Sequence, residues 1–140
     1  MPRWTDEQWQ AIEKSGSNIL VSAGAGSGKT AVLSERVIHK IENKIHVNEL
    51  LILTFTKAAA SEMKDRIRKK IAKNENMKEE LNLLNSSYIT TFDSFALSVV
   101  KKYHYLLNIS SDIGITDESI VRIKQKDILN QVFEDFYEKE

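Results

Sequence analysis

The feature that most constrains this chain is a glycine-rich segment, AGAGSGKT, at residues 23–30. It meets the Walker A or P-loop pattern G-x-x-x-x-G-K-[ST], except that Ala23 stands at the position of the first glycine. The residues before it, NILVSA at 18–23, have the composition of a short buried strand, and apolar residues at helical spacing follow over 29–42. A strand, a glycine-rich turn and a helix are the setting in which such a loop binds phosphate.

The chemistry of this loop predicts a site for a nucleotide and Mg²⁺. Glycines let backbone N–H groups converge on a phosphate without obstruction, and the start of the following helix adds the positive end of its dipole. We expect Lys29 to be the catalytic cation at the β- and γ-phosphates and the Thr30 hydroxyl to bind Mg²⁺. The predicted nucleotide-binding residues of the loop are Ala23, Gly24, Ala25, Gly26, Ser27, Gly28, Lys29 and Thr30. The alternative is a tight turn that contains glycine and lysine without binding phosphate.

The spacing of apolar residues along the chain predicts an α/β fold. Thr5 and Gln8 have the form of a capping box, which places a helix start near residue 6. We expect helices over 6–15, 29–42, 58–73, 79–84, 92–103 and 118–137, and strands over 18–23, 50–55 and 88–91. Strands that alternate with helices are typical of a parallel sheet with right-handed crossovers.

Two of the expected helices have apolar faces that predict burial. In the helix at 58–73 the inward residues are Ala60, Met63, Ile67 and Ile71. In the helix at 118–137 they are Ile128, Leu129, Val132, Phe133 and Phe136.

Composition places the chain among folded proteins. Leu, Ile, Val and Phe make up 40 of 140 residues, too large a share for a disordered chain. The longest run of Leu, Ile and Val, at 50–53, is far shorter than the roughly 20 residues of a membrane span. The absence of cysteine excludes disulfides and thiolate metal sites and fits a reducing compartment. The sequence therefore predicts a soluble cytoplasmic domain.

The net charge is zero, but the charges are unevenly distributed. Residues 1–73 hold 13 Lys+Arg and 8 Asp+Glu, whereas residues 74–140 hold 7 and 12. The basic residues concentrate in one segment, as Lys57, Lys64, Arg66, Arg68, Lys69, Lys70 and Lys73. Such a cluster attracts a phosphate backbone, and the alternative is an ordinary solvated helix face.

Four segments, in this order, resemble successive motifs of the superfamily 1 DNA helicases of the UvrD/Rep type. They are TDEQWQAI at 5–12, the P-loop at 23–30, LTFTKAAASEM at 53–63 and ITTFDSFALSVVKKY at 89–103. The opening motif and YLLNI at 105–109 are most similar to the AddA (RexA) group of bacterial helicase-nucleases. The resemblance covers nearly the whole chain, and four motifs in a shared order are far more specific than a P-loop alone.

The resemblance implies a partial P-loop NTPase fold, RecA-like and three-layered, with a parallel sheet. Residues 1–107 would be the N-terminal part of the RecA-like ATP-binding lobe, and residues 108–140 the start of an inserted helical subdomain. ATP hydrolysis also needs an apolar strand that ends in Asp-Glu. The only such pair after the loop, Asp117–Glu118, follows a poor strand, so we expect a fragment of a longer enzyme with little turnover of its own.

The resemblance also implies how the base of the nucleotide is bound. Gln8 would read the adenine edge, because a side-chain amide offers a donor and an acceptor in one plane. Its alternative role is helix capping, and both roles are compatible. Many relatives have an arginine after the loop threonine, where this chain has Ala31, so base selectivity rests more on Gln8.

Two further motifs match segments that contact single-stranded DNA in the family. The implied DNA-binding residues are Phe55, Thr56, Lys57, Thr91 and Phe92. Either phenylalanine would stack on a base or, alternatively, pack in the core. Relatives commonly have Asn at the position of Lys57 and often His at that of Asp93. Because an acid repels phosphate, Asp93 turns away, caps the helix that begins near Phe95, or weakens that contact.

The function implied by the resemblance is that of an ATP-dependent DNA helicase and translocase in double-strand-break repair and recombination. Its cofactors would be ATP and Mg²⁺, and its partners single- and double-stranded DNA and the B subunit of a helicase-nuclease. The parent protein would move 3′ to 5′ on DNA, in the cytoplasm. Two alternatives remain: a small P-loop nucleotide kinase, for which neither an acceptor site nor an arginine-rich lid is evident, and a non-enzymatic DNA-binding module.

Overall fold

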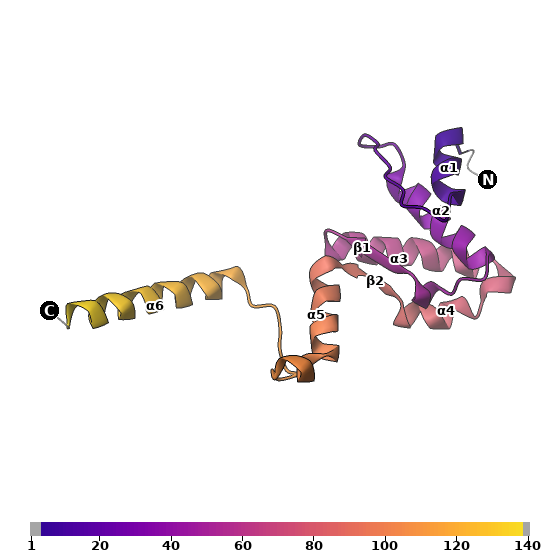
Figure 1. The fold of residues 1–140 in the computed structure, drawn as a ribbon. Helices are drawn as coiled ribbons and strands as arrows, with labels where there is room; N and C mark the ends of the chain where they lie inside the picture. Colours follow the sequence, from indigo (N-terminus) through magenta and orange to yellow (C-terminus); the bar gives the residue numbers. More distant parts are fainter. Residues whose placement is uncertain (1–3, 139–140) are drawn as a thin grey trace. The chain divides into compact units, whose positions relative to one another are not determined.

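The computed structural model describes residues 4–138 and divides into two units. The first unit extends to Phe95, and the second unit begins at Ala96. The helices of the first unit are α1 (Asp6–Glu13), α2 (Lys29–Glu42), α3 (Lys57–Ala72) and α4 (Glu80–Leu83), and its strands are β1 (Leu51–Thr54) and β2 (Tyr88–Thr91). Helix α5 (Phe92–Lys102) runs from the first unit into the second, which also contains α6 (Glu118–Tyr137) (Figure 1).

The expected helices and the two later strands are confirmed, with boundaries within two residues of the predictions. Helices α2 and α6 begin and end at the predicted residues. The capping box of α1 is also present, between Thr5 and Gln8. No described helix is long and apolar enough to cross a membrane.

The described sheet has two parallel strands, β1 and β2. Their register pairs Leu51 with Tyr88 and Thr54 with Thr91. Helix α3 packs against both strands, α2 packs against α3, and α1 packs against α2. Because the strands are parallel, their carboxyl ends lie at one edge of the sheet.

The core of the first unit lies between these layers. The predicted inward residues of α3, Ala60, Met63, Ile67 and Ile71, are all buried. Met63, Ile67 and Ile71 form one cluster with Ile52 and Ile89 from the strands and with an apolar face of α2. The buried residues of α2 are Val32, Ser34, Val37, Ile38 and Ile41, four of them apolar at helical spacing.

The expected strand at residues 18–23 is wrong for this structure. The segment has no regular secondary structure, and Leu20 is 95% exposed. A strand needs a neighbour that satisfies its backbone N–H and C=O groups, and a lone extended segment leaves them to water. Among the described residues, β1 and β2 pair only with each other. Residues 18–23 therefore have a composition that favours a strand but no neighbouring strand to pair with.

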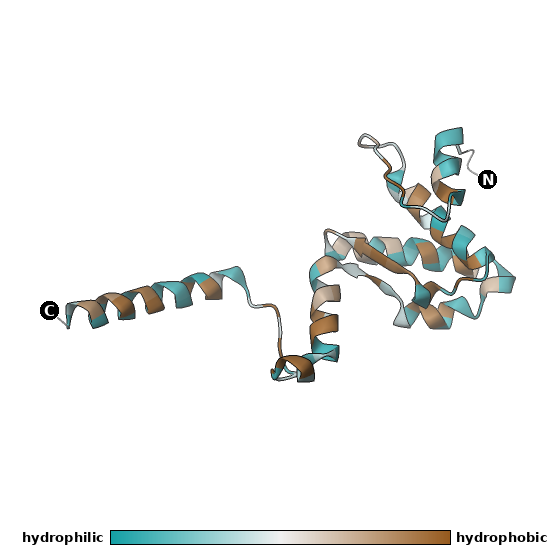
Figure 2. Ribbon diagram, in the orientation of Figure 1, coloured by the Kyte–Doolittle hydropathy of each residue, from teal (hydrophilic) through white to brown (hydrophobic). Residues whose placement is uncertain are grey.

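The expected burial of the α6 face is also wrong. Its five apolar residues, Ile128, Leu129, Val132, Phe133 and Phe136, are between 51% and 61% exposed. The helix itself begins where predicted because Asp117 caps it, its carboxylate accepting the Ser119 N–H at 2.8 Å. Figure 2 shows apolar and polar residues interspersed along α6. The helical spacing of the apolar residues correctly predicted the helix, but no described element covers its apolar side chains.

Candidate functional site

The glycine-rich loop has a backbone that only glycine adopts easily at two positions. Gly26 and Gly28 have φ angles of 76° and 83°, in the left-handed region. Gly28 is also the N-cap of α2, and its carbonyl accepts the Val32 N–H at 2.9 Å, the first turn of the helix. A Cβ on Gly26 would meet nothing within 4 Å, so the backbone conformation and not a lack of space favours glycine there. This backbone is suited to present N–H groups to an anion at a helix start.

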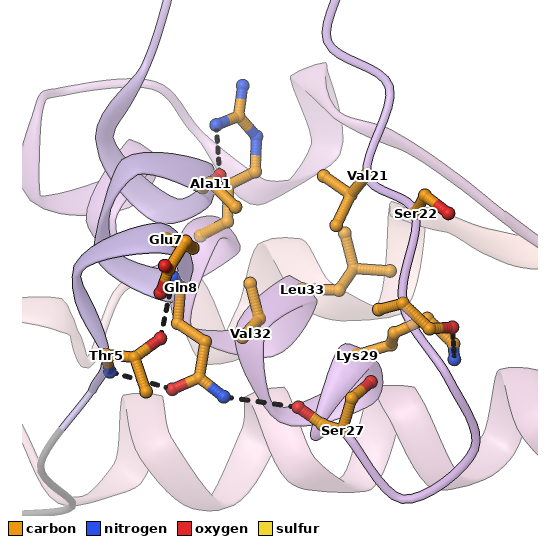
Figure 3. A pocket seen from close by; sticks show the side chains of 12 residues that line it. Thr5, Glu7, Gln8, Ala11, Val21, Ser22, Ser27, Lys29, Val32 and Leu33 are labelled. Atoms are coloured by element: carbon orange, nitrogen blue, oxygen red, sulfur yellow. Dashed lines mark hydrogen bonds between the residues drawn. The ribbon is translucent and has the colours of Figure 1, made fainter.

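Lys29 is exposed, and its side chain folds back onto the loop. Its Nζ donates hydrogen bonds to the carbonyl oxygens of Ala23 and Gly24, both at 2.6 Å; Figure 3 shows the bond to Ala23. The Ser27 hydroxyl also donates to the Gly24 carbonyl, at 2.8 Å. The ammonium is therefore held where a phosphate in the loop would meet it, and such an anion would compete with the two carbonyls for its protons.

A cavity of about 430 Å³ adjoins the loop. Figure 3 shows it between α1 on one side and Val21 and Ser22 on the other, with Val32 and Leu33 of α2 between them. Its apolar lining comes from Ala11, Val21, Val32 and Leu33, and its polar lining includes Gln8, Ser27, Lys29 and Arg36. An apolar cavity with a few polar groups beside a cationic loop is suited to a ligand with a flat ring and an anionic tail.

Gln8 connects α1 to the loop. Its Oε1 accepts the Thr5 N–H at 3.0 Å, and its Nε2 donates to the Ser27 carbonyl at 3.2 Å. The capping alternative is therefore present in the structure, and the amide also contacts the loop. Reading of adenine by Gln8 stays a prediction, because these bonds already use the amide oxygen and one N–H.

An acidic group stands at the start of α1. The backbone N–H of Glu7, and to a lesser extent the Thr5 hydroxyl, hold the pKa of the Glu7 carboxyl below its usual value. Glu7 is thus ionised at neutral pH at the rim of the cavity, where it stabilises the N-terminus of α1.

The predicted DNA-binding residues meet at the carboxyl edge of the sheet. Phe55 and Thr56 follow β1, and Thr91 and Phe92 lie at the end of β2 and the start of α5. Phe55 is fully exposed and Phe92 is 67% exposed, so the alternative that they belong to the core is wrong. Lys57, the first residue of α3, is exposed at the same edge.

Threonines cap both helices that leave this edge. Thr56 Oγ1 accepts the Ala59 N–H at 3.1 Å, and Thr91 Oγ1 accepts the Ser94 N–H at 3.2 Å. The cap of α5 is therefore Thr91, whereas Asp93 lies exposed in the first turn of the helix. Phe55 thus directly precedes the N-cap of α3, and Phe92 directly follows the residue that caps α5.

Part of the basic cluster on α3 is neutralised. Arg66 pairs with Glu62 and Arg68 with Asp65, both at 2.6 Å, and Lys70 pairs with Glu35 of α2. Lys57, Lys64, Lys69 and Lys73 take part in none of the ion pairs between described residues. Three of the seven charges are thus partly neutralised by neighbouring acids and four are not, and both the solvated-face and the anion-binding interpretation stay open.

Comparison with known families identifies the class of protein. The family model described as UvrD/REP helicase N-terminal domain matches residues 4–140. The chain belongs to this family, and the resemblance inferred from its four motifs is confirmed.

Individual relatives show which members of this family the chain resembles in sequence. The A subunit of the ATP-dependent helicase/nuclease from Heliobacterium modesticaldum is 47% identical over 99% of this chain, which covers 10% of that protein. The proteins of the same name from Geobacillus thermodenitrificans and Clostridioides difficile are 44% and 45% identical over 98% and 99% of the chain, which covers 12% of each. The chain thus spans about a tenth of the length of these relatives.

Of the residues that line the cavity, the sequence predicted Gln8, Ala23, Ser27 and Lys29 as site residues and missed the others, among them the charged side chain of Arg36. An arginine that follows the apolar Val32 and Leu33 in an amphipathic helix would have been the signal. Its partners lie 24 and 25 residues away in the sequence, so only the packed structure identifies them.

Proposed function

We propose that this chain is the N-terminal portion of an ATP-dependent DNA helicase and translocase of the AddA helicase-nuclease type, acting in double-strand-break repair and recombination. The observation that carries the proposal is the loop at residues 23–30, where Gly28 in the left-handed region is the N-cap of α2 and the Lys29 ammonium bonds to two carbonyls of the loop. The adjoining cavity and the family membership support it.

The residues of the loop are suited to Mg-ATP. Backbone N–H groups from Gly24 to Thr30 would hold the phosphates, Lys29 would balance their charge, and the exposed Thr30 hydroxyl would bind Mg²⁺. Bound Mg-ATP would supply the γ-phosphoryl group, whose transfer to water with release of ADP would drive movement on DNA. Gln8 and the apolar cavity would hold the adenine.

The edge formed by Phe55, Thr56, Lys57, Thr91 and Phe92 would bind single-stranded DNA; four of these residues are exposed, whereas Thr91 is buried. Two exposed aromatic rings offer stacking surfaces, each worth about 1–3 kcal/mol per base, beside a lysine for the phosphate backbone. Coupling between this edge and the nucleotide site is what a translocase requires.

In the parent protein, residues 1–107 would form the start of the ATP-binding lobe and residues 108–140 the start of an inserted helical subdomain. We propose double-stranded DNA and the B subunit of the helicase-nuclease as its further partners, 3′-to-5′ movement, and the cytoplasm as its location. The Asp117 carboxylate caps α6, a role that differs from holding Mg²⁺. We therefore expect the 140-residue chain to bind nucleotide with negligible turnover.

Titration with a fluorescent ATP analogue, with and without Mg²⁺, tests the nucleotide site. Lys29→Ala should weaken binding at least about tenfold, because the ammonium makes charge-assisted bonds to the phosphates. Lys124→Ala, an exposed lysine of α6, is the matched control and should leave the affinity unchanged. Equal affinity of the wild type and Lys29→Ala would contradict the assignment. Robust hydrolysis by the wild type would contradict the proposal that the chain is an incomplete part of the motor.

A non-enzymatic DNA-binding module is the second candidate, favoured by the two exposed phenylalanines. Titration with labelled single-stranded DNA distinguishes it. If binding falls in Phe55→Ala and Phe92→Ala but is indifferent to ATP and to Lys29→Ala, the module is the better description. A dependence of DNA affinity on nucleotide favours the translocase.

A further inference from the structure

Arg36, a residue of α2, hydrogen-bonds to the C-terminal end of α1. Its Nη1 donates to the Ala11 carbonyl at 2.7 Å and to the Ile12 carbonyl at 3.2 Å. Both carbonyls lie in the last turn of α1, where a helix leaves its C=O groups without partners inside the helix. A half-buried guanidinium at the negative end of the helix dipole satisfies them with charge-assisted bonds.

The other end of α1 is fastened to the loop. Gln8, in its first turn, donates to the Ser27 carbonyl, and Ile12 near its last turn is completely buried. A helix of eight residues has no stability of its own in water, so tertiary contacts decide where it lies. Arg36 and Gln8 are the polar contacts that do so from opposite ends.

The wall of the cavity therefore depends on Arg36. The helix contributes Gln8 and Ala11 to that wall, and Arg36 is itself part of the lining. We infer that Arg36 is a positioning residue that holds α1, and with it Gln8, against the base side of the nucleotide site. This inference rests on the proposed nucleotide-binding function.

The phosphate side of the site does not depend on Arg36 in the same way. The backbone of the loop is set by Gly26 and Gly28, and Lys29 is held by Ala23 and Gly24, all within residues 23–30. Loss of Arg36 should therefore weaken recognition of the base and spare recognition of the phosphates. Inorganic tripolyphosphate, which has no base, separates the two contributions.

The test measures ATP and tripolyphosphate affinity by competition with a fluorescent ATP analogue on the 140-residue chain. Arg36→Ala should lower the affinity for ATP about tenfold, as expected if the displaced Gln8 loses its hydrogen bond to the base, and change the affinity for tripolyphosphate less than about twofold. Arg36→Lys should be intermediate, because an ammonium lacks the planar fork of a guanidinium. Arg122→Ala, which removes an exposed arginine paired with Glu118 of the second unit, is the matched control and should change neither.

A double-mutant cycle with Gln8→Ala shows whether Arg36 acts through α1. In the Gln8→Ala background, Arg36→Ala should lower the affinity for ATP by less than about twofold, because the Gln8 contact that Arg36 positions is already lost. Full additivity, or an equal loss of ATP and tripolyphosphate affinity, would overturn the inference. If the circular dichroism of Arg36→Ala shows a loss of helix, Arg36→Lys takes its place in the test. The inference is then overturned if the ratio of ATP affinity to tripolyphosphate affinity is the same in Arg36→Lys and in the wild type. A wild type that binds neither ligand contradicts the proposed function instead.

Discussion

Helices α3 and α6 have the same kind of sequence and opposite surroundings. Both have apolar residues at helical spacing, and both are capped by a side-chain oxygen, from Thr56 and Asp117 respectively. In α3 the apolar residues are buried against the strands and α2, whereas in α6 they are more than half exposed. Periodicity thus establishes the helix, and burial depends on which other segments are present to cover it.

The difference predicts very different costs for the same kind of truncation. Ile67→Ala in α3 removes a completely buried side chain and should lower the free energy of unfolding by about 2–4 kcal/mol. Leu129→Ala in α6 removes a side chain that is 53% exposed and should cost less than about 0.5 kcal/mol. Urea unfolding followed by circular dichroism measures both. Similar losses at the two positions would show that the α6 face is covered in solution.

Two glycine-to-alanine substitutions, one in each unit, compare a strained backbone position with an unstrained one. Gly28→Ala forces a residue with a Cβ into a φ of 83° and should cost about 1–2 kcal/mol, together with a weaker affinity for the ATP analogue. The added Cβ would lie 3.5 Å from Gln8 Nε2, an ordinary contact, so strain and not collision is the cause. Gly114→Ala in the second unit, where φ lies outside the left-handed region and the space is open, should be neutral or slightly stabilising. An unchanged melting temperature in Gly28→Ala would contradict the loop geometry.

The smallest expected effect is a pH dependence of opposite sign in the two units. In the first unit, the His46 ring contacts Glu80 at 2.7 Å, and the hydrogen bond and charge of Glu80 raise the pKa of His46. This contribution is fully present below the unfolded pKa of about 6.5 and is lost as the pH rises through the raised folded value. The difference in unfolding free energy between the wild type and His46→Gln should therefore shrink between about pH 6 and pH 8.

Asp117 in the second unit should behave in the opposite way. The hydroxyl and the backbone N–H of Ser119 lower the pKa of this carboxyl, so its cap is present above the unfolded value and lost as the pH falls through the lowered folded value. Helix content measured by circular dichroism should drop in acid more in the wild type than in Asp117→Asn. If the difference in unfolding free energy between the wild type and His46→Gln is constant with pH, the His46 assignment is contradicted. If the wild type and Asp117→Asn lose helix content identically in acid, the Asp117 assignment is contradicted.

Much of the site was predictable because its determinants are local. The capping box at Thr5 and Gln8, the glycine turn before Lys29 and the helix at Lys29–Glu42 each depend on residues a few positions apart. Parallel pairing of β1 and β2 followed from strands that alternate with helices, and it brought the Phe55 and Phe92 motifs to one edge as expected of parallel strands. Family membership followed from four motifs in a shared order.

The sequence by itself therefore determined where helices begin and end, which glycines turn the loop, and the family to which the chain belongs. Only the tertiary structure decided that residues 18–23 lie outside the sheet with all but Ile19 exposed, that the apolar side chains of α6 remain uncovered, and that Arg36 binds the end of α1. Helix starts and turns follow from hydrogen bonds between near neighbours in the chain. Burial and long-range pairing require partners from distant segments, and a pattern of residues does not specify which partner comes to lie beside it.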